Sequence, residues 1–356
     1  MAPNQKQTVF WRVDKNCPDP EIIRQAGLIL RRGGLVAFPT ETVYGLGANA
    51  LDGAAVEGIF TAKGRPQDNP LIVHIADIDE VRKYALSVPE KARLLMKKFW
   101  PGPLTVILPS NGRISQRVSA GLPSLAFRIP DHPVALALIR EAGVPVAAPS
   151  ANLSGRPSTT TAEHVRSDLE GRIDAILDGG AAGVGMESTV VDMTGDVPVI
   201  LRPGGITPEQ IRAVAGEVAL DRSLEKAGRA PRRPRSPGMK YRHYAPSVPL
   251  VLVEGDAGRV VQEIKRQAAL YIGRGKKVGV LCRAGNQAEY AGTLAISAGR
   301  EADQSSVAAD LYDALRRFEG TGVDIILAEG VEPRGLGLAV ANRLRRASGG
   351  RIIKVE

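Results

Sequence analysis

Short apolar runs alternate with amphipathic segments between residues 19 and 201. The clearest helix begins at Asp19-Pro20, where an Asp can cap the helix and a Pro fits its first turn, and it ends at the glycines of residues 33–34. The same periodicity predicts helices at residues 52–60, 89–100 and 133–142, and apolar runs predict strands at residues 35–38, 71–75, 104–108, 125–129, 144–148, 175–177, 189–193 and 199–201. Because some adjacent strands leave no room for a helical crossover, we predict a mixed sheet.

The chain changes character at residues 220–249, which hold five prolines and two glycines and show no apolar periodicity. This composition is typical of a linker. Beyond it, predicted strands at residues 250–253, 278–281, 325–328 and 352–355 alternate with predicted helices at residues 260–271, 307–318 and 338–346. That alternation predicts a parallel sheet between helical layers. We therefore expect a mixed α/β domain at residues 1–219, a linker at 220–248 and a small Rossmann-like domain at 249–356.

The positive charge of the chain is concentrated in one segment. The net charge is +9, from 47 basic and 38 acidic residues. Residues 222–242 hold eight basic residues and one acidic residue, a net of +7. The basic character therefore belongs mostly to the linker and does not describe a broad nucleic-acid-binding surface. The composition, 44% hydrophobic and 24% charged, excludes a disordered or collagen-like chain.

Cysteine and histidine usage excludes several classes of site. Cys17 and Cys282 are too far apart to suggest a disulfide framework, and the four histidines form no metal-ligand cluster with them. We expect no metal site of the chain's own. P-loop, dinucleotide-binding and nucleophile-elbow motifs are also missing. The polar start of the chain and the lack of an apolar run of about 18 residues predict a cytoplasmic protein with no membrane association.

Polar clusters follow several predicted strands, at the place where open α/β sheets bind ligands. Residues 39–47 combine hydroxyl and small side chains, and Lys63 and Arg65 lie two positions apart beside Gly and Pro, a spacing suited to phosphate oxygens. Ser150 and Asn152 end another strand. Each cluster alone is also compatible with a polar turn, a solvated loop or a helix cap.

Three strands carry residues that are unusual for their positions. Arg128 interrupts an apolar strand, where a buried guanidinium needs an anion, and His74 interrupts another. Arg202 ends a third strand, where a surface loop is an equal alternative. Ser188 follows a glycine-rich stretch at residues 179–185, which predicts either an anion-binding nest or a flexible turn.

Taken together, these motifs resemble one family. Lys63-x-Arg65 and Ser150-x-Asn152 occur with matching segments at residues 39–46, 69–74, 100–105 and 236–246. This set resembles the long, two-domain form of threonylcarbamoyl-AMP synthase, in the YrdC-like family. The resemblance covers residues 19–246 with dense motifs and the trailing domain more loosely. An N-terminal extension and an arginine-rich insert at residues 229–235 depart from the family pattern.

The resemblance implies a nucleotidyltransferase that makes L-threonylcarbamoyladenylate from L-threonine, bicarbonate and ATP and releases pyrophosphate. The product would pass to the machinery that modifies tRNA at position 37, and direct tRNA binding stays open. ATP would carry Mg²⁺. Attack of a carbamate oxygen on the α-phosphorus needs positioning and charge neutralisation more than a covalent nucleophile.

The resemblance also implies roles for individual residues. Lys63 and Arg65 would hold the phosphates, and Ser150 and Asn152 would bind the nucleotide and organise the reacting centre. Arg128 would pair with the threonine carboxylate. The threonine pocket would also include Thr40, His74 and Ser188, and the nucleotide site Ser158, Arg202 and Tyr244.

The resemblance gives the linker a role and leaves alternatives to test. Residues 236–246 resemble a family loop that reaches back across the active site, so we expect a lid there, with Lys240 and Arg242 facing polyphosphate. For Arg229 to Arg235 we expect a solvated tether. The competing class is an RNA-binding protein with a basic concave sheet, which has little aromatic support in this chain. A second rival, the hydrogenase-maturation carbamoyltransferase, carries zinc-finger cysteines that this chain lacks.

Overall fold

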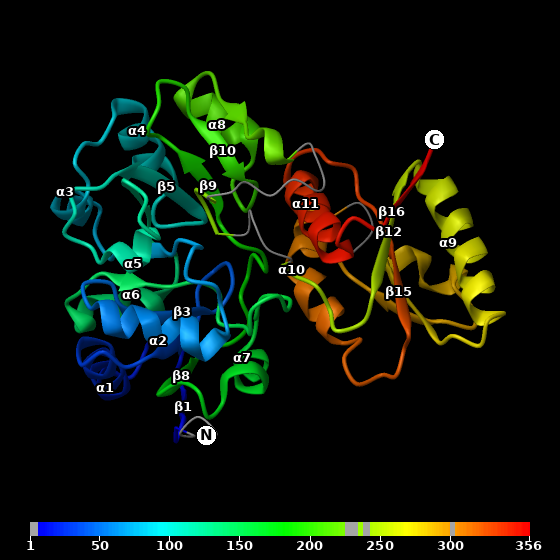
Figure 1. Cartoon of the computed structure of the whole chain (residues 1–356), viewed down its shortest axis with the longest axis horizontal. Helices are drawn as coiled ribbons and strands as arrows, with labels where there is room; N and C mark the ends of the chain where they lie inside the picture. Colours follow the sequence, from blue (N-terminus) through cyan, green and yellow to red (C-terminus); the bar gives the residue numbers. More distant parts are fainter. Residues whose placement is uncertain (1–5, 225–233, 238–242, 300–302) are drawn as a thin grey trace.

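The chain folds around two separate β-sheets, shown in Figure 1. The structure is a computed structural model, and it describes residues 6–224, 234–237, 243–299 and 303–356. The larger sheet is built from the N-terminal part of the chain and the smaller one from residues 250–355. No helix within those described ranges is both long and apolar enough to cross a membrane.

The N-terminal sheet has 11 strands and mixes parallel with antiparallel pairs, as the sequence predicts. For example, β4 pairs parallel with β6 and antiparallel with β7. Across the sheet the strand order is β1 (Val9–Arg12), β8 (Ala175–Asp178), β2 (Val36–Phe38), β3 (Gly45–Asn49), β7 (Val146–Ala147), β4 (Ile72–His74), β6 (Ser124–Arg128), β5 (Leu104–Pro109), β9 (Thr189–Asp192), β10 (Val199–Arg202) and β11 (Ala219–Leu220).

Helices pack on both faces of this sheet, because alternate strand residues face opposite sides. On β2, Val36 and Phe38 pack with α1 (Pro20–Arg31) and α6 (Pro133–Ala142), whereas Ala37 faces the other core. The second core contains residues of the helices α2 (Gly53–Lys63), α4 (Glu90–Phe99), α5 (Gln116–Ser119), α7 (Ala162–Leu169) and α8 (Pro208–Ala215). Two further short helices are η1 (Ile78–Glu80) and α3 (Val81–Tyr84).

Asp side chains fix the starts of the helices that matter most for the site. The Asp19 carboxylate accepts hydrogen bonds from Glu21 N and Ile22 N at the start of α1. Asp52 does the same for two amides at the start of α2, which then runs to Lys63 and stops at Gly64 with a φ of 60°. Lys63 is thus the last residue of a helix that is capped at both ends.

One half of the sheet presents a face formed by strand residues alone. There a small apolar cluster consists of Ile72, Ile107, Ala126, Val190 and Leu201. Residues two positions away on the same strands share that face by the alternation of the pleat. His74 lies two positions from Ile72, Arg128 two positions from Ala126, and Ser188 two positions from Val190. Their face of the sheet is the floor of the candidate site.

The C-terminal unit is a five-stranded parallel sheet between helices, as the sequence predicts. Its order is β14 (Leu294–Ser297), β13 (Val278–Cys282), β15 (Ile325–Glu329), β12 (Leu250–Gly255) and β16 (Ile352–Val355). One face packs on α9 (Ala257–Ile272) and the other on α10 (Gln304–Arg316) and α11 (Leu336–Ser348). A short 3₁₀ helix, η3 (Ala284–Glu289), follows β13.

The α10 and α11 face of this unit packs against the N-terminal part, and α9 lies on the far side (Figure 1). The shared core includes Val43, Met186 and Tyr244 together with residues of both helices. Gly185 allows the close approach: a Cβ there would lie 2.2 Å from the carbonyl oxygen of Ala309. Its φ of 70° also favours glycine.

The structure differs from the sequence-based expectations in places. The sequence patterns do not predict β1, β3, β11, β14, α3, α5, α7 and α8. The strand β3 reads as a polar, small-residue turn because glycines at 45 and 47 weaken the strand pattern, yet Gly47 pairs with Val36 and packs against Phe38. Arg235 is exposed, as a solvated tether would be, but its guanidinium also pairs with Asp192 at 2.6 Å and Asp221 at 2.9 Å. Residues 229–233 lie outside the described ranges.

Candidate functional site

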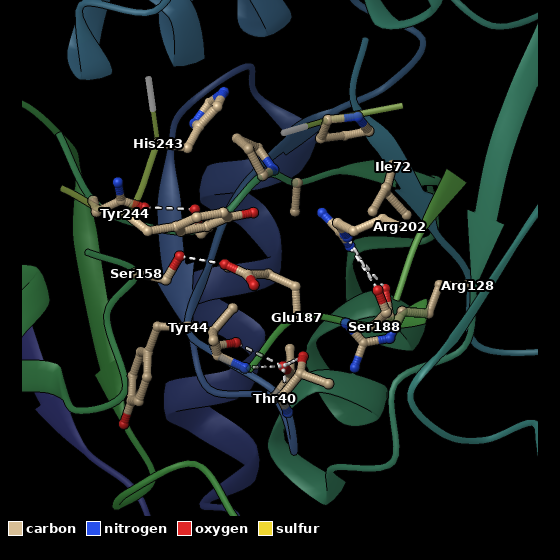
Figure 2. A pocket seen from close by; sticks show the side chains of 18 of the residues that line it. Thr40, Tyr44, Ile72, Arg128, Ser158, Glu187, Ser188, Arg202, His243 and Tyr244 are labelled. Carbon is tan, nitrogen blue, oxygen red and sulfur yellow. Dashed lines mark hydrogen bonds between the residues drawn. The ribbon is translucent and has the colours of Figure 1, made fainter. Parts of the chain in front are cut away.

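One pocket collects most of the residues singled out from the sequence (Figure 2). It lies over the strand-only half of the sheet and is closed on one side by the segment around Tyr244. Ten of the expected residues line it: Thr40, Arg65, His74, Arg128, Ser150, Asn152, Ser158, Ser188, Arg202 and Tyr244. The remaining one, Lys63, contacts the Ser150 loop from behind.

Lys63 holds the loop that carries Ser150 and Asn152. Its buried ammonium donates hydrogen bonds to the carbonyl oxygens of Ser150, at 2.5 Å, and Asn152. Burial, together with the nearby Arg65, lowers the pKa of Lys63 well below its usual value. Lys63 thus fixes the loop backbone, and a direct contact with phosphate stays a prediction.

Arg65 extends from the loop after α2 and lies in the pocket wall. One of its terminal nitrogens approaches the carbonyl oxygens of Asn69 and Pro70 at 3.4 and 3.3 Å. Its guanidinium is largely buried, so it presents a desolvated positive charge to the pocket. Such a group binds an anion more strongly than a solvated arginine does.

The Ser150 loop follows β7 and is internally braced. The Ser150 hydroxyl donates to Asn152 Oδ1 at 2.5 Å, and Asn152 Nδ2 donates to the carbonyl oxygens of Leu153 and Arg156. The Asp168 carboxylate accepts from Leu153 N at 3.0 Å. These contacts give the loop one conformation, with Ser150 and Asn152 in the pocket wall.

Arg128 and His74 are cross-strand neighbours at the ends of β6 and β4. Arg128 Nη2 lies 2.6 Å from a Glu41 carboxylate oxygen, so the anion that the sequence required is Glu41. Burial and the adjacent Arg128 lower the pKa of His74 to about 3, and its imidazole is therefore neutral near pH 7. Thr40 also lines the pocket, and its hydroxyl donates to the carbonyl oxygen of Val43 at 2.6 Å.

Ser188, directly before β9, and Arg202, at the end of β10, form a hydrogen-bonded pair (Figure 2). Arg202 donates to the Ser188 carbonyl oxygen from two nitrogens, at 3.1 and 3.0 Å, and to its hydroxyl at 3.2 Å. Arg202 is buried, which corrects the surface-loop alternative. Gly204 lets the two backbones meet, since a Cβ there would lie 2.3 Å from the Glu187 carbonyl oxygen.

Glu187 is a pocket residue that the sequence analysis missed. The buried carboxylate accepts hydrogen bonds from the hydroxyls of Ser158, at 2.5 Å, and Tyr312, at 2.8 Å, and from Arg343 Nε at 2.9 Å. Burial opposes its ionisation, but Arg343, Arg202 and the hydroxyl donors prevail and lower its pKa to about 2. Its position directly before Ser188 was the available sequence signal.

The expected lid segment returns to the pocket at Pro237 and at His243 and Tyr244. Tyr244 has a φ of 64°, a conformation that non-glycine residues rarely adopt. Its ring stacks on Tyr312 with centroids 5.5 Å apart. Burial and nearby Arg65 lower the pKa of His243 to about 3. Lys240 and Arg242 lie outside the described residues.

Arg156 and Thr42 also line the pocket, and Glu41 pairs with the lining residue Arg128; none of the three was singled out from the sequence, although Glu41 and Thr42 fall within the polar cluster at residues 39–47. Within the part of the chain that the structure describes, no group of three His, Cys, Asp or Glu side chains is arranged to hold a metal ion.

Known proteins resemble both halves of the chain. A family model described as "Telomere recombination" (Sua5_yciO_yrdC) matches residues 28–204, and "Threonylcarbamoyl-AMP synthase, C-terminal domain" matches residues 206–349. A threonylcarbamoyl-AMP synthase of Bacillus subtilis is 54% identical over 98% of this chain and 100% of its own length. One of Pyrococcus abyssi is 50% identical over 94% and 96%. The crystal structure of P. abyssi Sua5 complexed with L-threonine matches with a TM-score of 0.93 and 48% identity, over 98% of this chain and 100% of that one.

The mixed α/β sheet with its arginine-lined pocket and the trailing parallel unit define a two-part α/β enzyme with a YrdC-like fold. The identities over nearly the whole length define it further. The chain belongs to the threonylcarbamoyl-AMP synthase family and is an enzyme with that synthase activity. These similarities support the synthase over the RNA-binding alternative.

Proposed function

We propose that this pocket converts L-threonine, bicarbonate and ATP into L-threonylcarbamoyladenylate and pyrophosphate. The observation that carries the proposal is the meeting of two cationic groups in one pocket: Arg128 on the strand-only face and Arg65 on the loop after α2. A small amino acid and a polyphosphate need separate cations that are held close enough for their ligands to react. P. abyssi Sua5, 48% identical to this chain, was crystallised in complex with L-threonine, which supports threonine as a substrate here.

In the proposed threonine subsite, Arg128 binds the carboxylate, and Thr40, His74 and Ser188 line the pocket around the side chain and amine. The buried, neutral imidazole of His74 suits this place because it adds a hydrogen-bonding group without a second positive charge. The Ser188 hydroxyl is held by Thr105 at 2.7 Å, which fixes its direction.

In the proposed nucleotide subsite, Arg65 faces the phosphates directly, and Lys63 contributes to phosphate binding by holding the Ser150 loop beside them. Ser150 and Asn152 order the reacting centre. Ser158, Arg202 and Tyr244 complete this site. Mg²⁺ would enter with ATP as part of the substrate. The cationic and hydroxyl donors suit phosphate oxygens, while the Glu187 carboxylate is already taken up by three protein donors.

The proposed reaction uses positioning and charge neutralisation. The threonine amine and bicarbonate first give a carbamate, and water leaves. A carbamate oxygen then attacks the α-phosphorus of ATP, the new O–P bond forms, and the bond from the α-phosphorus to the bridging oxygen breaks to release pyrophosphate. Arg65 and Arg202 offset the charge on the phosphates, and Arg128 holds the nucleophile in line.

Several wider expectations belong to the same proposal. The product would be handed to the machinery that modifies tRNA at position 37, and the protein would work in the cytoplasm. We propose residues 1–219 as the catalytic domain, 220–248 as linker and lid, and 249–356 as the C-terminal domain. The contacts of Tyr244 with the pocket support the lid.

A pyrophosphate-release assay tests the proposal directly. The full chain is incubated with all three substrates and then with each omitted in turn, and the adenylate is identified by mass spectrometry. We expect release only when L-threonine, bicarbonate and ATP are all present. Equal release without threonine would show a simple ATP hydrolase and would contradict the proposed reaction.

A further inference from the structure

Two side chains of the C-terminal unit contact a residue that lines the pocket, Glu187. Tyr312 on α10 and Arg343 on α11 both donate to the Glu187 carboxylate, at 2.8 and 2.9 Å. Both are fully buried. Burying a guanidinium costs free energy unless well-placed hydrogen bonds compensate for the lost solvent. The buried Arg343 therefore indicates that the position of its hydrogen-bond partners is important.

Arg343 joins two segments that flank a pair of site residues. While Nε donates to Glu187, another nitrogen, Nη1, donates to the carbonyl oxygen of Pro203 at 2.9 Å. Glu187 directly precedes Ser188, and Pro203 directly follows Arg202. Ser188 and Arg202 are themselves hydrogen-bonded. One side chain of the C-terminal unit therefore bridges the neighbours of two residues of the proposed site.

The same two side chains also hold Tyr244. The Tyr312 ring stacks on Tyr244 at an interplanar angle of 27°, and the Arg343 guanidinium lies over the Tyr244 ring at 5.3 Å. Figure 2 shows Tyr244 beside Ser158 and Glu187, with Ser188 and Arg202 further along the wall. The donors to Glu187 thus also support the strained backbone at Tyr244.

We propose that Tyr312 and Arg343 are positioning residues, through which the C-terminal unit aligns Ser188, Arg202 and Tyr244 for the reaction by way of Glu187. This inference rests on the proposed function of the pocket. Docking of the C-terminal unit then completes the active site, in addition to stabilising the chain. A misplacement of about 1 Å in such a site can cost roughly 100-fold in rate.

Two conservative substitutions test the inference. Tyr312→Phe keeps the ring that stacks on Tyr244 and removes only the hydroxyl that donates to Glu187. Arg343→Lys keeps the positive charge but replaces the planar fork, so that it cannot donate to Glu187 and Pro203 in the same way. For each, kcat and both KM values are measured by pyrophosphate release, and the unfolding temperature is recorded.

The matched control is Asp313→Asn. Asp313 follows Tyr312 on α10 and contacts His164 at 3.4 Å across the same pair of units, away from Glu187. It tests whether any loss of a polar contact between the units lowers the rate.

We expect kcat to fall at least tenfold in Tyr312→Phe and Arg343→Lys, while both KM values change less than threefold. Substrate binding depends on many contacts, whereas the alignment of Ser188, Arg202 and Tyr244 depends on these two side chains. Asp313→Asn should keep the wild-type kcat. A wild-type kcat in Tyr312→Phe, or an equal loss in Asp313→Asn, would overturn the inference. If the wild-type chain itself needs no threonine for pyrophosphate release, the proposed function fails instead.

Discussion

The guanidinium of Arg128 lies 2.6 Å from the carboxylate of Glu41, and both side chains are largely removed from solvent. The residue proposed to bind the threonine carboxylate is therefore already paired with a carboxylate of the protein. Removing one partner of a buried ion pair costs free energy, because the remaining charge is left without a partner. Threonine has to share Arg128 with Glu41 or displace it.

Replacing Arg128 should remove threonine recognition while sparing the nucleotide. A charge-assisted hydrogen bond contributes about 1.5–3 kcal/mol, so Arg128→Ala should weaken threonine binding at least tenfold. Isothermal calorimetry measures the affinity, with ATP titrated into the same variant as the control. Unchanged threonine binding in a folded variant would remove Arg128 from the threonine subsite.

Replacing Glu41 should have the opposite effect on threonine affinity. Glu41→Gln removes the charge that competes for Arg128 and keeps a side chain of the same size. We expect threonine to bind about threefold tighter or more, since a charged partner no longer has to be displaced. The free protein should unfold at a lower temperature, because Arg128 is left buried without a counter-charge. Weaker threonine binding would show instead that Glu41 contacts the amino acid.

Arg65 offers a test of phosphate recognition that leaves the charge in place. Arg65→Lys keeps the positive charge but loses the planar fork that we propose contacts two phosphate oxygens, so kcat/KM for ATP should fall by about tenfold or more. The measurement is pyrophosphate release at varied ATP, with threonine affinity as the control. Wild-type turnover in Arg65→Lys would contradict forked contact at this position.

The pKa of Glu187 predicts acid-dependent stability. It is lowered from 4.5 to about 2 in the folded protein, so the folded state holds its proton less tightly than the unfolded chain. The resulting stabilisation, up to about 3 kcal/mol, is present above pH 4.5 and is lost as the pH falls toward 2. Chemical unfolding of the wild type and Glu187→Gln should give a difference that shrinks over this range. A constant difference would mean that Glu187 does not titrate there.

Local sequence signals predicted much of the fold because their causes are local. The capping carboxylates of Asp19 and Asp52, the glycines that end the helices and the apolar runs of the strands act over a few residues. The sequence did not predict β3 because this strand is stabilised by pairing with β2 and not by its own residues. Gly47 packs against Phe38 only when β2 lies beside it.

The sequence by itself determined most of the charged and hydroxyl side chains that are available for the pocket. Arg128 in an apolar strand required an anion, and the motifs around Lys63 and Ser150 marked the cationic wall. Only the tertiary structure decided that the anion is Glu41 and that Glu187 accepts from Tyr312 and Arg343, more than a hundred residues away along the chain. The physical reason is that a buried charge must be neutralised, but any carboxylate or guanidinium satisfies that requirement. For Glu187, the packing of α10 and α11 against the N-terminal part selects Tyr312 and Arg343; for Arg128, the position of the loop after β2 selects Glu41.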